Sequence, residues 1–266
     1  MTYSESSLVS RPLKLPVRTL SLSIDGQWRK YYLKKKGPPS LRVVLQAWLR
    51  FQKPLSATAR ELMLLELMRQ EGIPVMSPVA WGEQRILGCS FNGFIIVEEV
   101  TGKEFVDVYR GASLRVRRRL FLLYGGLMGV LHRKGIDSKV RPQDLICVSD
   151  DYTNFQNCFV VIDRERGQSH VVELSTEQCG SRLGDIWVKG MFLIGLGERS
   201  ELLAFLSGYL TEVSRQGVCK ERGIRCVNLV ERASRRAAEV LYQDNRFESL
   251  RKGFHMHYGI GLKAHA

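Results

Sequence analysis

The stretch Leu131-His132-Arg133-Lys134-Gly135-Ile136-Asp137-Ser138-Lys139-Val140-Arg141-Pro142-Gln143-Asp144-Leu145-Ile146-Cys147-Val148 decides the fold of this chain. It predicts a helix that ends at Gly135, a polar loop and a short apolar strand, because glycine is a typical stop after a helix. The loop carries two aspartates, Asp137 and Asp144, on either side of Val140. A valine can neither accept a proton nor bind a hard cation, so the centre of this loop lacks catalytic chemistry of its own.

Composition and cysteine usage exclude several classes of protein. The chain has 266 residues, of which 44% are hydrophobic and 25% charged, as in a globular protein. No apolar run reaches the roughly 18–20 residues that a membrane span needs, and residues 1–6 lack the features of a signal peptide. The six cysteines form no C-x-x-C pair and no metal-ligand spacing. The sequence therefore predicts a cytoplasmic protein with reduced thiols.

The net charge of +13 is unevenly distributed. Residues 1–60 contain twelve Lys and Arg against two acidic residues, and residues 110–141 contain nine against one. Residues 61–109 are acidic instead, with eight Asp and Glu against three basic residues. This pattern predicts a polyanionic partner, which by charge alone is a phosphorylated substrate, an anionic membrane surface or nucleic acid. The alternative is a solvated basic surface, for example at Arg115–Arg119, without a specific partner.

Strands dominate the first hundred residues and helices the remainder, which predicts an α+β chain of two lobes, residues 1–100 and residues 101–266. Thr58 and Glu61 fit a capping box, and Ser113 is placed to cap a long helix that ends near Lys134. The expected strands cover 18–24, 27–34, 74–81, 91–97, 145–148 and 159–162, and the expected helices cover 41–51, a segment after 58, 113–134, 185–194, 200–213 and 229–242.

Four features follow one another in the order of a protein-kinase-like fold. Lys34 ends an early strand, Glu61 lies on the next long helix, the loop after His132 follows, and Asp163 ends an apolar strand. Alone, Lys34 is one lysine in a Lys-Lys-Lys run, Glu61 is a capping residue and Asp163 opens a turn. Their order and spacing together favour the kinase-like interpretation, a bilobal α+β fold with an antiparallel N-lobe sheet and a mainly helical C-lobe.

Several strings make the resemblance more specific. Four strings together resemble the bacterial lipopolysaccharide-core (heptose/Kdo) kinase family. They are Tyr31-Tyr32-Leu33-Lys34-Lys35-Lys36, Ala59-Arg60-Glu61-Leu62, Gly72-Ile73-Pro74-Val75-Met76-Ser77-Pro78-Val79-Ala80-Trp81-Gly82-Glu83 and Val161-Ile162-Asp163-Arg164-Glu165-Arg166-Gly167-Gln168. The resemblance covers roughly residues 18–215. It implies an ATP-dependent enzyme that phosphorylates an inner-core sugar of the growing glycolipid on the cytoplasmic side of the inner membrane.

The resemblance also implies roles for individual residues. Lys34 would bind the ATP phosphates, Glu61 would pair with Lys34, and Asp163 would coordinate magnesium. Glu98, Glu99 and Val100 would form the hinge that contacts adenine through backbone groups. Asp185 would play the structural role of the aspartate that opens the next large helix. His132 is expected to be structural and to close the helix before the loop.

The loop departs from the family pattern, which reads Gly-Ile-Asn-His-Arg-Asp. Here Gly135-Ile136-Asp137-Ser138-Lys139-Val140 occupies that register, so Val140 stands where the family has the aspartate that receives the hydroxyl proton. Leu145 stands where kinases place a second metal ligand. The leading hypothesis is a pseudokinase of envelope glycolipid assembly that binds ATP and magnesium and recognises a core glycolipid, another anionic substrate or a partner, peripherally at the inner membrane.

Two other functions remain open at this point. One is an active phosphotransferase in which Asp137 or Asp144 acts as a substitute base, since positioning and charge neutralisation supply much of the catalysis of phosphoryl transfer. The other is a basic nucleic-acid-binding protein, which rests on charge alone because the sequence carries no recognised nucleic-acid motif. The sequence does not specify the acceptor sugar, the protein partner or the oligomeric state.

Overall fold

The chain divides into two units in a computed structural model. Met1–Thr101 together with Val161–His170 form unit 1, and Gly102–Val160 together with Val171–Ala266 form unit 2. The residues that the structure describes are 8–9, 17–24, 26–39, 41–49, 51, 54–86, 89–163, 171, 173–195, 197–214, 222–243, 247–248 and 250.

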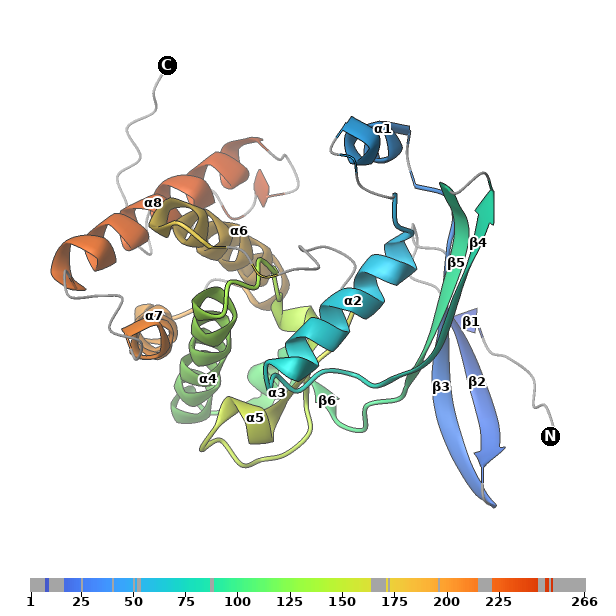
Figure 1. Cartoon of the computed structure of the whole chain (residues 1–266). Coiled ribbons are helices and arrows are strands. Elements are labelled where there is room, and N and C mark those ends of the chain that lie inside the picture. Colours follow the sequence, from blue (N-terminus) through green and yellow to red (C-terminus); the bar gives the residue numbers. More distant parts are fainter. Residues whose placement is uncertain are drawn as a thin grey trace. The chain divides into compact units, whose positions relative to one another are not determined.

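Within the described residues, unit 1 contains an antiparallel sheet and two helices (Figure 1). The strands lie in the order β1-β2-β3-β5-β4, and every neighbouring pair is antiparallel. A tight turn at Gly26, with φ of 75°, joins β2 to β3, while Asp25 of the expected Asp-Gly turn lies outside the described residues. The elements are β1 (Leu8–Val9), β2 (Val17–Ile24), β3 (Gln27–Lys36), α1 (Leu41–Leu49), α2 (Ala57–Gln70), β4 (Pro78–Ile86) and β5 (Cys89–Glu98).

One face of this sheet packs against α2 and forms the core of unit 1. The core comprises Leu62, Leu65, Met76, Ile95 and Val97, all buried. On β3, Tyr32 pairs with Val97 and Lys34 pairs with Ile95. Because residues directly opposite each other in neighbouring strands project to the same face of a sheet, Lys34 projects toward the α2 face.

Two local expectations for unit 1 are wrong in detail. The N-cap of α2 is Ser56, not Thr58, because the Ser56 hydroxyl accepts a hydrogen bond from the Ala59 backbone N–H at 3.0 Å. The strand expected at 74–81 begins only at Pro78, since Val75 forms an isolated parallel bridge with Val161. The backbone N–H of Met76 donates to the Val161 carbonyl at 3.0 Å. The earlier part of this segment is therefore engaged by the chain that leads to Asp163.

Unit 2 is mainly helical, with a three-stranded sheet in the order β6-β7-β8. Its elements are β6 (Lys103–Glu104), α3 (Phe105–Gly111), α4 (Leu114–Arg133), the 3-10 turn Pro142–Asp144, β7 (Leu145–Cys147), α5 (Phe155–Cys158), β8 (Phe159–Val161), α6 (Thr176–Ile194), α7 (Arg199–Ser214) and α8 (Arg222–Gln243). As expected, Ser113 caps α4 by accepting from the Val116 N–H at 3.5 Å. Helices α6 and α8 begin earlier in the chain than expected.

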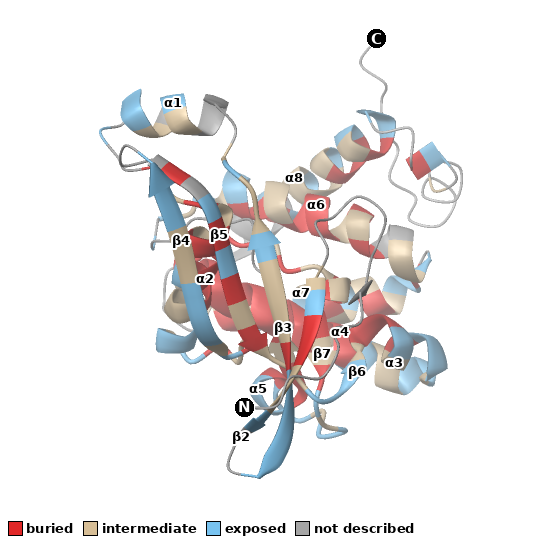
Figure 2. Cartoon of the chain, turned by 90° about the vertical axis from the view of Figure 1, so that its right-hand side faces the viewer, coloured by how far each residue is buried: buried red, intermediate tan, exposed pale blue. Residues whose placement is uncertain are grey.

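The pair α4 and α7 forms the centre of unit 2, and Figure 2 shows buried positions along both helices. A Cβ atom at Gly125 would lie 1.9 Å from the Phe205 carbonyl oxygen, so only glycine permits this close approach. The adjacent core is aromatic, with Phe105, Tyr124 and Phe205 in tilted or edge-on contacts. This packing holds the end of α4, and hence the start of the polar loop, in place.

The expected α+β architecture, with the larger sheet in the first unit and mainly helices in the second, is confirmed. Within the described ranges no helix is both long and apolar enough to cross a bilayer. Among the cysteine side chains that the structure describes, Cys147, Cys158 and Cys179 are free thiols.

Candidate functional site

The best-defined polar cluster of unit 1 joins Lys34, Glu61 and Asp163. The Lys34 ammonium donates to the Glu61 carboxylate at 2.7 Å and to the Asp163 carboxylate at 3.1 Å. Strand β3 supplies the lysine, helix α2 the glutamate, and the segment after β8 the aspartate. The structure therefore brings Lys34 together with two residues that lie 27 and 129 positions away from it in the sequence.

Burial strengthens the ion pairs between Lys34 and the two carboxylates of this cluster. The Glu61 side chain is 0% exposed and that of Lys34 is 12% exposed. Burial disfavours the ammonium form, but Glu61 and Asp163 outweigh it and raise the pKa of Lys34. Since the N-cap of α2 is Ser56, Glu61 lies in the helix interior and its partner is Lys34. The capping-box explanation for Glu61 is therefore wrong.

Asp163 has an unusual backbone conformation that presents its carboxylate. Its φ is 58°, in the left-handed region that few non-glycine residues adopt and that aspartate tolerates better than most. Its side chain remains 23% exposed. A residue held in a sparsely populated conformation beside a buried ion pair is a common feature of functional sites.

The predicted hinge residues follow at the end of β5, and their polar groups have local partners. The Glu99 carboxylate accepts from the Lys30 ammonium at 2.6 Å and from the Tyr32 hydroxyl at 2.8 Å. The hydrogen bond from Lys30 holds the pKa of Glu99 below its usual value. The backbone N–H of Glu98 donates to Ser77, and Val100 packs against the core of unit 1. The structure does not join these side chains to the Lys34 cluster.

Sequence reasoning did not identify the Lys30 and Tyr32 partners of Glu99. A signal was present, because Lys30, Tyr32 and Lys34 alternate along β3 and so project to one face of the strand. Strand alternation alone does not show that Glu99 reaches that face, since Glu99 lies beyond the end of β5.

In unit 2, the centre of the polar loop is buried in the core. Val140 is 0% exposed, as are Ile136 and Leu145 on either side of it. The hydroxyl of Tyr124, a buried residue of α4, donates to the Val140 carbonyl at 2.6 Å. Val140 thus lies inside the core of this unit.

The two candidate substitute bases of this loop both have arginine partners. Asp137 accepts two hydrogen bonds from the Arg182 guanidinium, at 2.6 and 2.7 Å, and these bonds lower the pKa of Asp137. Asp144 is 1% exposed and accepts from the Arg141 guanidinium at 2.7 and 2.9 Å and from its backbone N–H at 3.0 Å. Each carboxylate therefore has a structural partner in place.

Asp185 anchors the loop to two helices. It lies in the middle of α6 rather than at its start, so the expectation that it opens a large helix is wrong. Its carboxylate accepts from Lys139 of the loop and, at 2.8 Å, from Arg236 of α8. Burial alone would raise the pKa of Asp185, but Lys139 and Arg236 outweigh burial and lower it. Sequence reasoning did not identify Arg182 and Arg236 as partners, because their separations of 45 and 51 residues leave no local pattern.

His132 ends α4 as a buried, neutral side chain. Its Nδ1 and the Tyr209 hydroxyl are 2.9 Å apart, and the two rings meet edge to face. Burial lowers the pKa of His132 to about 4, so the imidazole is uncharged at neutral pH. This geometry agrees with a structural role.

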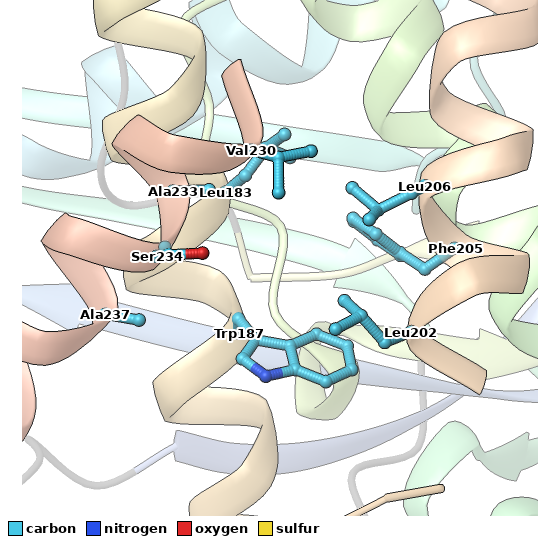
Figure 3. A pocket seen from close by; sticks show the side chains of 10 residues that line it. Leu183, Trp187, Leu202, Phe205, Leu206, Val230, Ala233, Ser234 and Ala237 are labelled. Carbon is cyan, nitrogen blue, oxygen red and sulfur yellow. The ribbon is translucent and has the colours of Figure 1, made fainter. Parts of the chain in front are cut away.

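Unit 2 also contains an apolar pocket between α6, α7 and α8 (Figure 3). Trp187, Leu202 and Phe205 point into it, and Ser234 supplies a single hydroxyl. Its volume is about 50 Å³, and its lining contains no charged residue. These properties are those of a packing defect between helices rather than a polar catalytic site.

Asp163 is the residue that the sequence predicts to hold magnesium, and in the structure its carboxylate accepts a hydrogen bond from Lys34. No cluster of three or more His, Cys, Asp and Glu side chains occurs among the residues that could be searched. Magnesium is often held by one or two carboxylates together with substrate phosphates, so a single aspartate beside Lys34 fits a metal that arrives with a nucleotide. Leu145 contributes no ligand to such a site.

Comparisons with known proteins identify the family. A search of curated proteins gives no significant match. Among solved structures, the chain is similar to one described as "WaaP in complex with acyl carrier protein", with a TM-score of 0.54, 21% sequence identity and 89% of each chain covered. That similarity confirms the expected two-lobed, kinase-like α+β fold. The profile of the lipopolysaccharide kinase (Kdo/WaaP) family matches residues 17–175, more than half of the sequence. The chain belongs to the lipopolysaccharide kinase (Kdo/WaaP) family.

Proposed function

We propose that this chain is a pseudokinase of lipopolysaccharide-core assembly, which binds ATP with magnesium in unit 1 but does not transfer phosphate. The observation that carries the proposal is the contrast between the two units. Unit 1 retains a buried cluster of Lys34, Glu61 and Asp163. Unit 2 has a fully buried valine, Val140, where the family has its proton acceptor.

The Lys34 cluster supports nucleotide binding. A buried glutamate fixes the ammonium of Lys34 in place, so little conformational entropy is lost when that ammonium meets a phosphate. Magnesium would arrive with the nucleotide and neutralise phosphate charge, while the Asp163 carboxylate would hold it. The present bond from Lys34 to Asp163, at 3.1 Å, keeps the carboxylate near the ammonium that would share those phosphates.

The hydrogen-bond partners of Asp137 and Asp144 support the proposal that the chain does not transfer phosphate. A general base must lie within reach of the hydroxyl and must be basic enough to accept its proton. Val140 and Leu145 provide no acceptor, and the two hydrogen bonds from Arg182 reduce the basicity of Asp137. The Arg141 guanidinium donates two hydrogen bonds to the Asp144 carboxylate.

We expect the retained function to be recognition of the core glycolipid. Phosphorylated glycolipids are polyanions, and the net charge of +13 favours their binding. A pseudokinase of this type would bind the glycolipid or deliver it to another enzyme of the envelope pathway, with nucleotide stabilising the competent conformation.

Calorimetric titration with ATP, with and without magnesium, tests the nucleotide site. Wild type should bind only when magnesium is present, and both Asp163→Asn and Lys34→Met should abolish binding. The matched control is Lys35→Met, because Lys35 is the exposed neighbour of Lys34 on the opposite face of β3. Absence of binding by wild type, or equal loss in the Lys35 variant, would contradict a nucleotide site at Lys34.

The intact Lys34–Glu61–Asp163 cluster also favours a second function, an active kinase with a displaced base. The decisive assay is transfer of labelled phosphate from ATP to purified core glycolipid. The pseudokinase proposal predicts no transfer above that of Asp163→Asn. Transfer that is lost in Asp137→Asn or Asp144→Asn, with ATP binding retained, would establish the active kinase instead.

A further inference from the structure

Helix α1 presents large apolar side chains to solvent. Leu45, Trp48 and Leu49 are 54%, 55% and 80% exposed. Their spacing of three and four residues places them on one face of the helix. Phe51 follows directly after α1 and is 100% exposed. Figure 2 shows exposed positions on α1.

The backbone after α1 favours this presentation. Phe51 has φ of 53°, in the left-handed region, and its N–H donates to the Trp48 carbonyl at 2.9 Å. For a bulky aromatic residue this conformation is uncommon and costs free energy. Phe51 adopts this conformation with its side chain 100% exposed.

The charge of the surrounding sequence identifies the kind of partner. Residues 26–60 contain nine Lys and Arg and no acidic residue, so α1 lies in a stretch of uniformly positive charge. Tryptophan prefers the boundary between lipid headgroups and acyl chains, where its ring meets apolar surroundings and its N–H stays in a polar region. A short helix with Trp, Leu and Phe on one side and basic residues nearby is typical of interfacial membrane binding.

We infer that α1 and Phe51 form a surface that lies on an anionic phospholipid bilayer and inserts Leu45, Trp48, Leu49 and Phe51 at headgroup depth. With nine residues α1 is too short to cross a bilayer, so it lies in the plane of the interface. The inference rests on the proposed function, because a protein that handles a membrane-anchored glycolipid gains by staying at the surface that holds it. The lipid contact itself needs no nucleotide.

The test is co-sedimentation of the full chain with vesicles. The lipids are phosphatidylethanolamine with phosphatidylglycerol, compared with phosphatidylcholine alone. Wild type should bind the anionic vesicles, and the triple variant Leu45→Gln/Trp48→Gln/Leu49→Gln should bind at least tenfold more weakly. Separately, Arg50→Gln should weaken binding about fivefold at low salt, since each basic residue near an anionic surface contributes to attraction.

The matched control removes exposed apolar surface elsewhere. Trp28 and Leu203 are 61% and 66% exposed, so Trp28→Gln/Leu203→Gln removes comparable surface without changing α1. This control should bind vesicles like wild type. Brominated acyl chains should quench tryptophan fluorescence of wild type, and the quenching should fall when Trp48 is replaced by Phe.

The outcomes separate this inference from the nucleotide proposal. Lys34→Met should lose ATP binding and keep vesicle binding, whereas the α1 triple variant should do the reverse. Vesicle binding by the α1 variant equal to that of wild type would overturn the inference, and the exposed face would then be assigned to a protein partner. Absence of wild-type binding, equal binding to phosphatidylcholine or equal loss in the control variant would overturn it as well.

Discussion

Val140→Asp introduces the aspartate that the family resemblance implies at this position, and the structure predicts that the substitution destabilises unit 2. Val140 is 0% exposed, so the substitution removes a buried apolar side chain worth about 2 kcal/mol. Burial of even a neutral carboxyl group without a partner adds about 1 kcal/mol or more. We therefore expect a loss of about 3 kcal/mol near pH 4, where the new side chain stays protonated.

The cost should grow as the pH rises. A buried aspartate has its folded pKa raised above the unfolded value, so destabilisation begins above the unfolded pKa of about 3.9 and increases until the pH exceeds the folded pKa. The slope is about 1.4 kcal/mol per pH unit, so the loss relative to wild type should increase by roughly 3 kcal/mol between pH 5 and pH 7. Val140→Asn has nearly the same shape and no titration, so its loss should stay near 3 kcal/mol at both values.

Urea unfolding of wild type and both variants at pH 5 and pH 7 measures these differences directly. Phosphate transfer to core glycolipid should stay absent in Val140→Asp at either pH. A stability of Val140→Asp within about 1 kcal/mol of wild type, independent of pH, would refute the reasoning, because the side chain would then reach solvent. Transfer by that folded variant would further show that the loop retains the geometry of a working kinase.

Three other predictions concern stability. Gly125→Ala should lower the free energy of unfolding by about 2–4 kcal/mol, because the added Cβ would collide with a backbone carbonyl of α7. Gly126→Ala should melt close to wild type, since the nearest atom to its added Cβ is 3.9 Å away. Equal melting temperatures of the two variants would contradict the close approach at Gly125. His132, with its pKa lowered to about 4 by burial, must charge on unfolding, so wild type should lose about 3 kcal/mol between pH 6.5 and pH 4, and His132→Asn should flatten that part of the pH profile. Arg182→Met should cost about 2–3 kcal/mol at neutral pH by leaving Asp137 without its main partner. Because the pKa of Asp137 is lowered in the fold, this loss should be present above the unfolded pKa of about 3.9 and should vanish as the pH falls through the folded pKa, and a loss that persists at lower pH would contradict the assignment.

Local patterns predicted many of the elements. Ser113 caps α4 and glycine ends it at Gly135, because the capping side chain and the stop residue act within one helical turn. The same local reasoning failed at α2, where both Ser56 and Thr58 have capping chemistry. The Ser56 hydroxyl accepts from the Ala59 backbone N–H, so the helix begins after Ser56 and Glu61 lies in its interior.

The sequence by itself determined the family and the order of Lys34, Glu61 and Asp163, since each follows a recognisable element and the strings around them are specific. Only the tertiary structure decided which carboxylates have cationic partners and where Val140 lies. Arg182 and Arg236 reach the loop region from α6 and α8 through helix packing, which no local spacing encodes. The burial of Val140 likewise depends on α4, whose Tyr124 hydroxyl donates a hydrogen bond to the Val140 carbonyl. Short-range patterns specify helices and turns, whereas burial and ion pairing depend on elements that are distant in the chain.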